Sequence, residues 1–428
     1  MALCSSYHAT LLRSIVAHKS ILSSTRRLPN ELLAEIFTVV VRDEFYRRSN
    51  SGPMSEYPWV LTRVCRRWRA VAVGTHSLWS WVFLDLDVMP GVGGVVSRTK
   101  LFCERSGNSP LEIKIEQRRE KPKRHDVFNV VLAHAERWQY LSLSLPGESV
   151  LAINSDMLGR LDALTTLRIR TAVGTRFEPI DSFTTAPNLT AVCLWTYNVT
   201  PPFPLPWKQL TCLSTTLASN KEALSILPQL SHIVELRLVF RDSAVGVLPP
   251  NSITLVCLRS LEMRQHGLNH VTSSSLLDCL TCPILEHLMT ERTALVDTVL
   301  RFIARSGCSR TLNSFYFLLR SMSAEKVLAL VHEMPCLSTL QIGDFQDGTA
   351  SKSSCIVRAL HSHWLTVRRN SRTSRLVVRL VDHAGWCLPV YDVGVDADAF
   401  STAKNDGLSI EISAWPKSFT SVVDTKFQ

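Results

Sequence analysis

Few residues of this sequence have the types and the spacing that catalysis or metal binding requires. Cys279-x-x-Cys282 has the spacing of half a zinc site, but no second cysteine pair follows at a suitable distance, so we expect core thiols. Gly91-Val-Gly93-Gly94 resembles the start of a dinucleotide-binding loop, but the third glycine position is Val96. No GxxxxGK[ST], HExxH or GxSxG motif occurs. The sequence predicts a protein that is not an enzyme and needs no metal ion or other cofactor.

Composition narrows the class of protein further. The 428 residues are 46% hydrophobic and 20% charged, which excludes a disordered chain. The net charge of +10 fits either an anionic partner or a soluble surface. No stretch reaches the roughly 18 apolar residues of a membrane span. The 12 cysteines are scattered rather than spaced like a small disulfide framework. We therefore expect a cytoplasmic or nuclear protein without a membrane partner.

Three charged segments leave alternatives open. Residues 1–27 contain several cations and no acid, which fits either a targeting segment or, as we favour, a short helix from Ala9 to Leu22. The basic clusters at 118–124 and 368–379 fit solvated faces, and a nucleic-acid role is the weaker alternative. Aromatic residues of the kind that stack on single strands are not interleaved with these cations. We expect no nucleic-acid partner.

Two helices are predicted near the N-terminal end. Pro29 and Glu31 are typical of a first helical turn, and an apolar stripe follows, with a second predicted helix from Trp59 to Val73 and a polar loop from Arg42 to Pro58 between them. The stripe comprises Leu32, Leu33, Ile36, Phe37 and Val40. A two-helix unit of this size cannot bury all of this surface alone, so a partner is expected to cover part of it.

These residues also carry a resemblance to a known family. The Leu-Pro-x-Glu-Leu-Leu-x-x-Ile-Phe motif from Leu28 to Phe37, the run from Val64 to Arg69 and the pair Leu78-Trp79 together resemble an F-box domain of the expanded fungal type. The connection from Arg42 to Tyr57 is longer than the family pattern. The resemblance implies docking onto a Skp-type adaptor and, through it, a cullin scaffold. The matching adaptor-binding positions are Leu28, Pro29, Leu32, Ile36, Val64, Cys65 and Trp68.

The 58 leucines resolve into a repeat in which an apolar residue, two others, an apolar residue, one other and an apolar residue recur. The first positions fall at 138, 164, 189, 210, 233, 258, 285, 312 and 337. This spacing is that of leucine-rich repeats, which stack a short strand and a helix or turn per unit around one core. Trp81 to Leu86 and Leu111 to Ile115 are predicted to start the array, and Leu408 to Ile412 to form a final strand.

Helices are predicted between the strands, each opened by Ser or Thr as a possible N-cap. They span Ser219–Leu227, Ser273–Leu280, Thr293–Ser306 and Ser323–Met334. The predicted fold class is α/β, a small all-α F-box-like module followed by a leucine-rich-repeat solenoid with parallel strands in a horseshoe. The predicted organisation is an N-terminal segment at 1–27, the module at 28–80 and the solenoid with a C-terminal cap at 81–428.

Strand residues that alternate with the apolar pair are expected to line the concave face of the solenoid. Arginine and aromatic side chains, the commonest binding anchors, occur there. The predicted target-binding residues are Arg168, Arg170, Trp195, Arg237, Arg264 and Tyr316, accompanied by Cys193, Val239, Glu262 and Gln341. We expect a protein target that carries acidic or phosphorylated groups.

The sequence thus predicts the substrate-recognition subunit of an SCF-type cullin-RING ubiquitin ligase, with an F-box that binds the adaptor and repeats that bind an unknown target protein. The alternative is a leucine-rich-repeat interaction scaffold that does not engage the ligase. Adaptor binding and target binding both act by raising effective concentration, without bond chemistry in this chain.

Overall fold

The computed structural model divides the chain into two compact units, residues 1–117 with 124–139, and residues 118–123 with 140–428. The residues it describes are 26–47, 57–87, 92–117, 126–146, 157–171, 181–195, 204–244, 253–265, 274–291, 296–318, 324–343, 377–382 and 409–414, with a few isolated positions at 11, 14–15, 358 and 360–362. The segment 48–56, the basic cluster at 118–124 and the basic residues at 368–375 lie outside them. Among the described helices, none is long and apolar enough to cross a bilayer.

The first unit is mixed α/β. Its elements are α2 (Asn30–Arg47), α3 (Trp59–Val64), α4 (Arg66–Gly74), η2 (His76–Trp79), β1 (Trp81–Asp85), α5 (Val92–Arg105), β2 (Leu111–Glu116), α6 (Asp126–Leu132) and η3 (Ala135–Arg137). β1 and β2 pair in parallel through the α5 crossover, a βαβ unit that the sequence did not predict. The predicted boundary at residue 80 falls inside this unit.

Two predictions for the helices of the first unit need correction. The polar loop expected from Arg42 begins later, because α2 continues to Arg47. Val41 and Phe45 continue the buried row of Leu33 and Phe37 at intervals of four residues, and each is 3% exposed. The helix expected from Trp59 to Val73 is two helices, because Cys65 is fully extended at φ −160° and ψ 171°.

Two tryptophans show where the repeat begins. Trp79 donates its Nε1 hydrogen to the carbonyl of Ala72 at 2.8 Å, and Trp138 donates to Val131 at 3.2 Å in the same i to i−7 relation. Trp79, not Trp81, therefore occupies the first repeat position, followed by Val82 and Leu84. Both of the latter are fully buried. The predicted frame is two residues late, since an indole at either position satisfies the pattern.

The second unit contains a long parallel sheet of eleven described strands in the order β3-β4-β5-β6-β7-β9-β11-β12-β13-β14-β15. The strands are β3 (Trp138–Ser144), β4 (Thr166–Arg170), β5 (Ala191–Trp195), β6 (Cys212–Ser219), β7 (Glu235–Ala244), β9 (Ser260–Gln265), β11 (His287–Glu291), β12 (Ser314–Leu318), β13 (Thr339–Gly343), β14 (Val377–Asp382) and β15 (Ser409–Ala414). All nine predicted repeats from 138 to 337 fall on strands, and the final strand is β15. Sequential parallel order is compatible with an α/β solenoid.

The repeat leucines form ladders through this sheet because equal positions pair from strand to strand. The central ladder runs through Leu141, Leu167, Val192, Leu213, Leu236, Leu261, Leu288, Phe315 and Leu340. Each of these side chains is at most 2% exposed, and full burial of one stabilises the fold by about 1.5–3 kcal/mol. The leucine excess therefore builds one continuous core along the strands.

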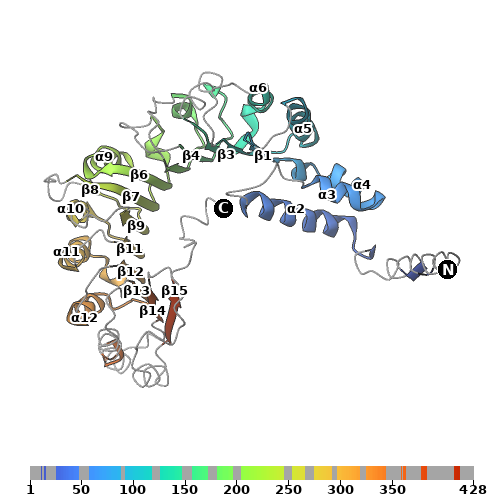
Figure 1. Ribbon diagram of the computed structural model, residues 1–428. Helices are drawn as coiled ribbons and strands as arrows, with labels where there is room; N and C mark the ends of the chain where they lie inside the picture. Colours follow the sequence, from blue (N-terminus) through green and yellow to red (C-terminus); the bar gives the residue numbers. More distant parts are fainter. Residues whose placement is uncertain are drawn as a thin grey trace. The chain divides into compact units, whose positions relative to one another are not determined.

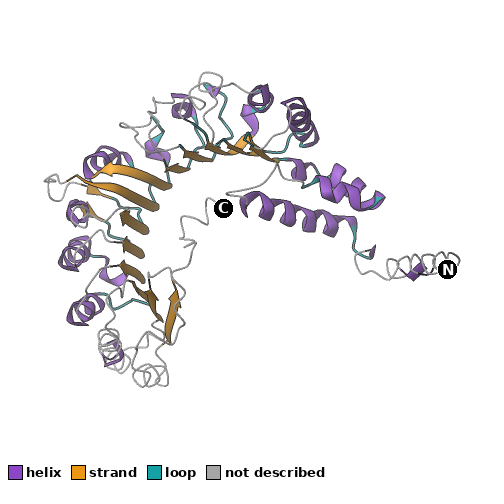
Figure 2. Cartoon of the chain, viewed as in Figure 1, coloured by secondary structure: helices purple, strands orange, loops and turns teal. Residues whose placement is uncertain are grey.

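Helices connect several of these strands and lie along one side of the sheet (Figures 1 and 2). They are α9 (Asn220–Ile226), α10 (Ser274–Cys279), α11 (Val296–Ser306) and α12 (Ala324–Glu333). The four predicted helices are confirmed, and Ser219 is the N-cap of α9. Short elements complete the unit, namely η4 (Asp181–Thr185), η5 (Trp207–Gln209), η6 (Leu227–Gln229), η7 (Cys308–Arg310) and the pair β8 (Ile253–Thr254) with β10 (Leu280–Thr281).

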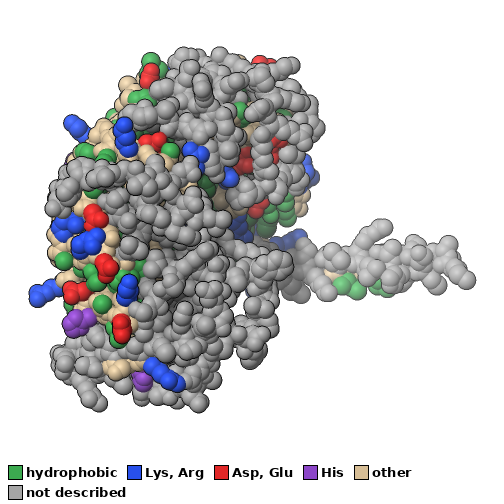
Figure 3. Space-filling view, turned by 60° about the vertical axis from the view of Figure 1, so that its left-hand side comes forward, with side chains coloured by type: hydrophobic (Ala, Val, Ile, Leu, Met, Phe, Trp, Pro, Cys, Tyr) green, Lys and Arg blue, Asp and Glu red, His purple; other side chains and the backbone are tan. Residues whose placement is uncertain are grey.

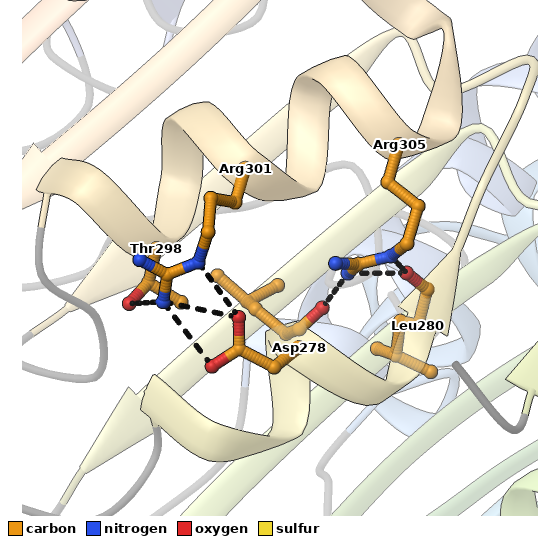
Figure 4. A network of polar contacts seen from close by, with 6 residues as sticks. Asp278, Leu280, Thr298, Arg301 and Arg305 are labelled. Atoms are coloured by element: carbon orange, nitrogen blue, oxygen red, sulfur yellow. Dashed lines mark hydrogen bonds and ion pairs between the residues drawn. The ribbon is translucent and has the colours of Figure 1, made fainter. Parts of the chain in front are cut away.

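Neighbouring helices are joined by arginines from α11 (Figure 4). Arg305 donates to the carbonyl oxygens of Leu277 and Leu280, with Nε 3.0 Å from the latter. It thereby satisfies a carbonyl in the last turn of α10 that no intrahelical donor reaches. Arg301, one turn earlier, forms an ion pair with Asp278 at 3.2 Å that is largely exposed. The two contacts fix α11 against α10.

Candidate protein-interaction sites

The first candidate site is an apolar face of α2, called here the α2 face and formed by Leu32, Ile36, Val39 and Val40. These side chains are between 37% and 54% exposed. Leu33 and Phe37, in the same helix, are only 1% exposed. The sequence stripe is therefore split, with one row packed in the unit and the adjacent row facing solvent. Four neighbouring exposed apolar side chains on one helix are typical of a protein-binding surface.

Val64 and Cys65 add exposed positions at the junction of α3 and α4. Val64 is 55% exposed, and the extended Cys65 is the N-cap of α4, where its Sγ accepts a hydrogen bond from the Trp68 backbone at 3.4 Å. The sulfur thus replaces the oxygen that usually caps a helix. Exposed Arg63 and Arg66 flank the pair. This junction combines an apolar surface with positive charge.

The packing of α2 and α4 is held by an aromatic contact and by one arginine. The rings of Phe37 and Trp68 lie 4.8 Å apart. Arg67 donates to the Asn30 Oδ1 atom at 2.8 Å, to the Arg26 carbonyl at 2.8 Å and to the Leu28 carbonyl. Arg67 therefore ties the start of α2 to α4. These contacts give the α2 face a fixed orientation relative to α4.

The second half of α2 packs on the first two strands. Tyr46 donates its hydroxyl hydrogen to Glu112 of β2 at 2.5 Å, and the Lys114 ammonium lies 5.9 Å from the Phe45 ring. Burial raises the pKa of Glu112 above its ordinary value of 4.5, although the hydrogen bond from Tyr46 opposes the shift. The helices that carry the α2 face are therefore anchored to the βαβ part of the same unit.

The structure places the seven predicted adaptor-binding residues as follows. Pro29, Leu32, Ile36, Val64 and Cys65 are exposed, whereas Leu28 and Trp68 are half-buried. None of the seven is in the buried core, although the Trp68 ring packs against Phe37 in a tilted arrangement. Val39 was missed by the sequence analysis because it lies outside the stripe, and no motif position marks it.

The second candidate site is the inner face of the second unit, defined as the strand positions that alternate with the buried ladder. Its middle row runs through Ser142, Arg168, Cys193, Ser214, Arg237, Glu262, Met289, Tyr316 and Gln341. From Cys193 to Gln341 every member is at most 7% exposed. Ser142 and Arg168, at the β3 and β4 end, are half-buried. Among the members whose side chains the structure describes, the row is therefore accessible at the β3 and β4 end.

In the middle of this face, the charged side chains pair with one another. Arg237 Nε lies 2.9 Å from Glu262 Oε2, with side-chain exposures of 5% and 3%. Arg264 contacts the other oxygen of the same carboxylate. One buried carboxylate thus compensates two guanidinium groups on neighbouring strands, which favours a structural role for Arg237. Tyr316 lies further along the row and is 5% exposed.

The open end has a different chemistry, because strands β3 to β6 contain no Asp or Glu and two arginines. Arg170 is exposed, and its guanidinium carbon lies 5.9 Å from the centre of the half-buried Trp195 ring. Arg168 hydrogen bonds the Tyr140 hydroxyl. Burial raises the pKa of Tyr140, so that hydroxyl is neutral at pH 7. Of the six predicted target-binding residues, the structure brings Arg168, Arg170 and Trp195 together here.

Other chemistry suggested by the sequence finds little support in the described residues. No group of three or more His, Cys, Asp or Glu side chains among them is arranged to hold a metal ion. Cys279 and Cys282 are buried, as predicted. Burial and, to a lesser extent, the neighbouring Cys308 raise the pKa of the Cys282 thiol. Gly93 and Gly94 lie in the first turn of α5. On the face shown in Figure 3, cationic and anionic side chains are interspersed rather than gathered by sign.

The sequence matches no protein-family model and no curated protein.

Proposed function

We propose that this chain is an F-box-type substrate receptor of an SCF ubiquitin ligase, in which the first unit binds a Skp-type adaptor and a repeat solenoid of leucine-rich type binds the target protein. The observation that carries the proposal is the α2 face. Its residues are apolar and exposed on a helix whose adjacent row is packed, and Leu32 and Ile36 are among the positions that match the F-box pattern. Burying exposed apolar side chains of this kind against a partner is favourable because it removes apolar surface from water.

Two further features support the proposal. Arg63 and Arg66 flank the exposed Val64 and Cys65, which favours a partner with an acidic rim. The anchoring of α2 on β2 through Tyr46 and Glu112 makes the α2 face a rigid part of its unit. A receptor needs such rigidity to hold a target at a defined distance from the transfer enzyme.

The test is co-purification of the full chain with a Skp-type adaptor. Ile36→Asp places a carboxylate in the α2 face and is expected to weaken adaptor binding at least thirtyfold, the effect of losing a hot-spot residue. Val256→Asp is the matched control, because Val256 is 56% exposed and Ile36 is 46% exposed, but Val256 lies in the second unit. Its adaptor binding should equal that of the wild type.

The alternative is a repeat scaffold that does not engage the ligase. It predicts that the wild-type chain does not retain the adaptor at all, or that Ile36→Asp and Val256→Asp retain it equally. Either result would overturn the proposed function. Circular dichroism of the three proteins establishes that each is folded.

A further inference from the structure

We infer that a second surface of the first unit binds an acidic segment of a partner protein, rich in Asp and Glu side chains. This surface, called here the α5 arginine surface, consists of Trp59 at the start of α3 and of Arg98, Leu101 and Arg105 on α5. The inference goes beyond the proposed function, because none of these four residues belongs to the motifs that resemble an F-box or to the α2 face.

Spacing along α5 places three of these residues on one side of the helix. Arg98, Leu101 and Arg105 follow one another at intervals of three and four residues, which forms a single stripe on an α-helix. All three are half-buried. Phe102, next to Leu101, is only 2% exposed and packs beneath them. A partner that docks here therefore meets two guanidinium groups with an apolar side chain between them.

Trp59 from α3 holds the two arginines in place. The guanidinium carbons of Arg98 and Arg105 lie 5.6 Å and 5.1 Å from the centre of the Trp59 ring. Arg105 also lies 4.3 Å from the centre of the buried Trp79 ring, and the two indole rings are 5.0 Å apart and nearly perpendicular. The arginines are thus largely ordered before a partner binds, which reduces the entropy cost of binding. Arginine and tryptophan are also the residue types most enriched among interface hot spots.

Charge complementarity indicates the chemistry of the partner. Helices α3, α4 and α5 contain seven Arg or Lys residues, one on α3 and three on each of the other two, and a single carboxylate, Glu104. Partial burial lowers the pKa of Arg105 below its ordinary value of 12.5, and the charge of Glu104 opposes this shift only in part. A cation that is partly removed from water attracts a carboxylate more strongly than a fully solvated one does. Carboxylates of a partner therefore complement this surface better than neutral side chains do.

The test measures binding of the purified full chain to two immobilised peptides of equal length, one of alternating Glu and Ser and one of alternating Gln and Ser. We expect only the acidic peptide to bind, with an affinity that falls as the salt concentration rises. Arg98→Glu should weaken this binding about tenfold to a hundredfold, which is the effect of losing one charge-assisted hydrogen bond. Arg98→Gln, which removes the charge without reversing it, should show a smaller loss.

Lys100→Glu is the matched control, because Lys100 is exposed on the same helix and the net charge changes equally. It follows Arg98 by two residues and so lies on another side of α5. This variant should bind the acidic peptide as the wild type does. Circular dichroism of the three variants establishes that each is folded.

Three results would overturn the inference. The first is equal binding of the acidic peptide by Arg98→Glu and the wild type. The second is an equal loss in Arg98→Glu and Lys100→Glu, which would indicate attraction to net charge alone. The third is binding to vesicles that contain phosphatidylserine but not to the acidic peptide, which would identify a membrane surface instead. Adaptor co-purification of Arg98→Glu should equal that of the wild type, so this test and that of the proposed function fail independently.

Discussion

Neutralising the buried carboxylate of Glu262 is expected to destabilise the second unit far more than neutralising the more exposed carboxylate of Glu286. Glu262→Gln keeps the size of the side chain and removes the charge that faces Arg237 and Arg264. Since Arg237 is only 5% exposed, water cannot replace the lost carboxylate. Breaking a buried ion pair in this way costs about 3–5 kcal/mol.

Glu286→Gln is the comparison. Glu286 pairs with Arg259 one strand apart in the same sheet, but the two side chains are 31% and 55% exposed. An ion pair that water reaches contributes about 0–1 kcal/mol. The structure therefore predicts a difference of roughly 3 kcal/mol between two chemically identical substitutions.

The assay is urea-induced unfolding, combined with hydrogen exchange of the β7 and β9 amides. Exchange isolates the local stability of these strands in a chain that has two units. A second variant, Arg237→Met with Glu262→Leu, removes both partners and should recover most of the lost stability. If the β7 and β9 amides exchange as slowly in Glu262→Gln as in Glu286→Gln, the buried ion pairs of Glu262 do not stabilise these strands as expected.

Three other predictions follow from local contacts. Since burial raises the pKa of Glu112, its contribution to stability is present below about pH 4.5 and is lost as the pH rises through the raised value. Unfolding measured at pH 4.5 and pH 7.5 should therefore show Glu112→Gln gaining stability relative to the wild type at the higher pH, and a constant difference would contradict this. Burial also raises the pKa of the Cys308 thiol to about 11, so iodoacetamide mapped by mass spectrometry should modify exposed Cys65 but leave Cys308 intact until unfolding. Arg305→Ala should cost about 1.5–3 kcal/mol because charged hydrogen bonds to α10 are lost, whereas Arg301→Ala should cost at most about 1 kcal/mol; equal losses in thermal unfolding would argue against the capping role.

The repeat was predictable because its signal is periodic and its cause is simple. A strand that packs on a common core must place apolar residues at equal positions, and the sequence shows these from Trp138 to Leu340. The helices between them were predictable for the same reason, since Ser219 marks an N-cap and Pro228 lies close to the end of α9. The frame of the first repeat was missed because Trp79 and Trp81 fit the pattern equally well, and only the bond from Trp79 to Ala72 distinguishes them.

The break at Cys65 and the length of α2 were also beyond the sequence. No glycine or proline interrupts the run around Cys65, so nothing local predicts an extended residue there. The last turn of α2 packs on β2, where the Lys114 ammonium lies 5.9 Å from the centre of the Phe45 ring. These two residues are about 70 positions apart in the sequence, so the contact has no local signal. Tertiary packing overrides the polar composition that favoured a loop.

Periodicity and residue type were enough to predict parallel repeats, a leucine core and a helix with an apolar stripe near residue 30, because a common core requires apolar residues at equal positions. Which apolar residues of that helix remain exposed became clear only from the folded unit, because it depends on what packs against the helix. The tertiary structure also shows that two of the predicted arginines have different environments. Arg237 is paired with a buried carboxylate, whereas Arg170 is exposed to solvent beside Trp195. Both arginines occupy the same kind of strand position, and what distinguishes them is the charge on the neighbouring strand.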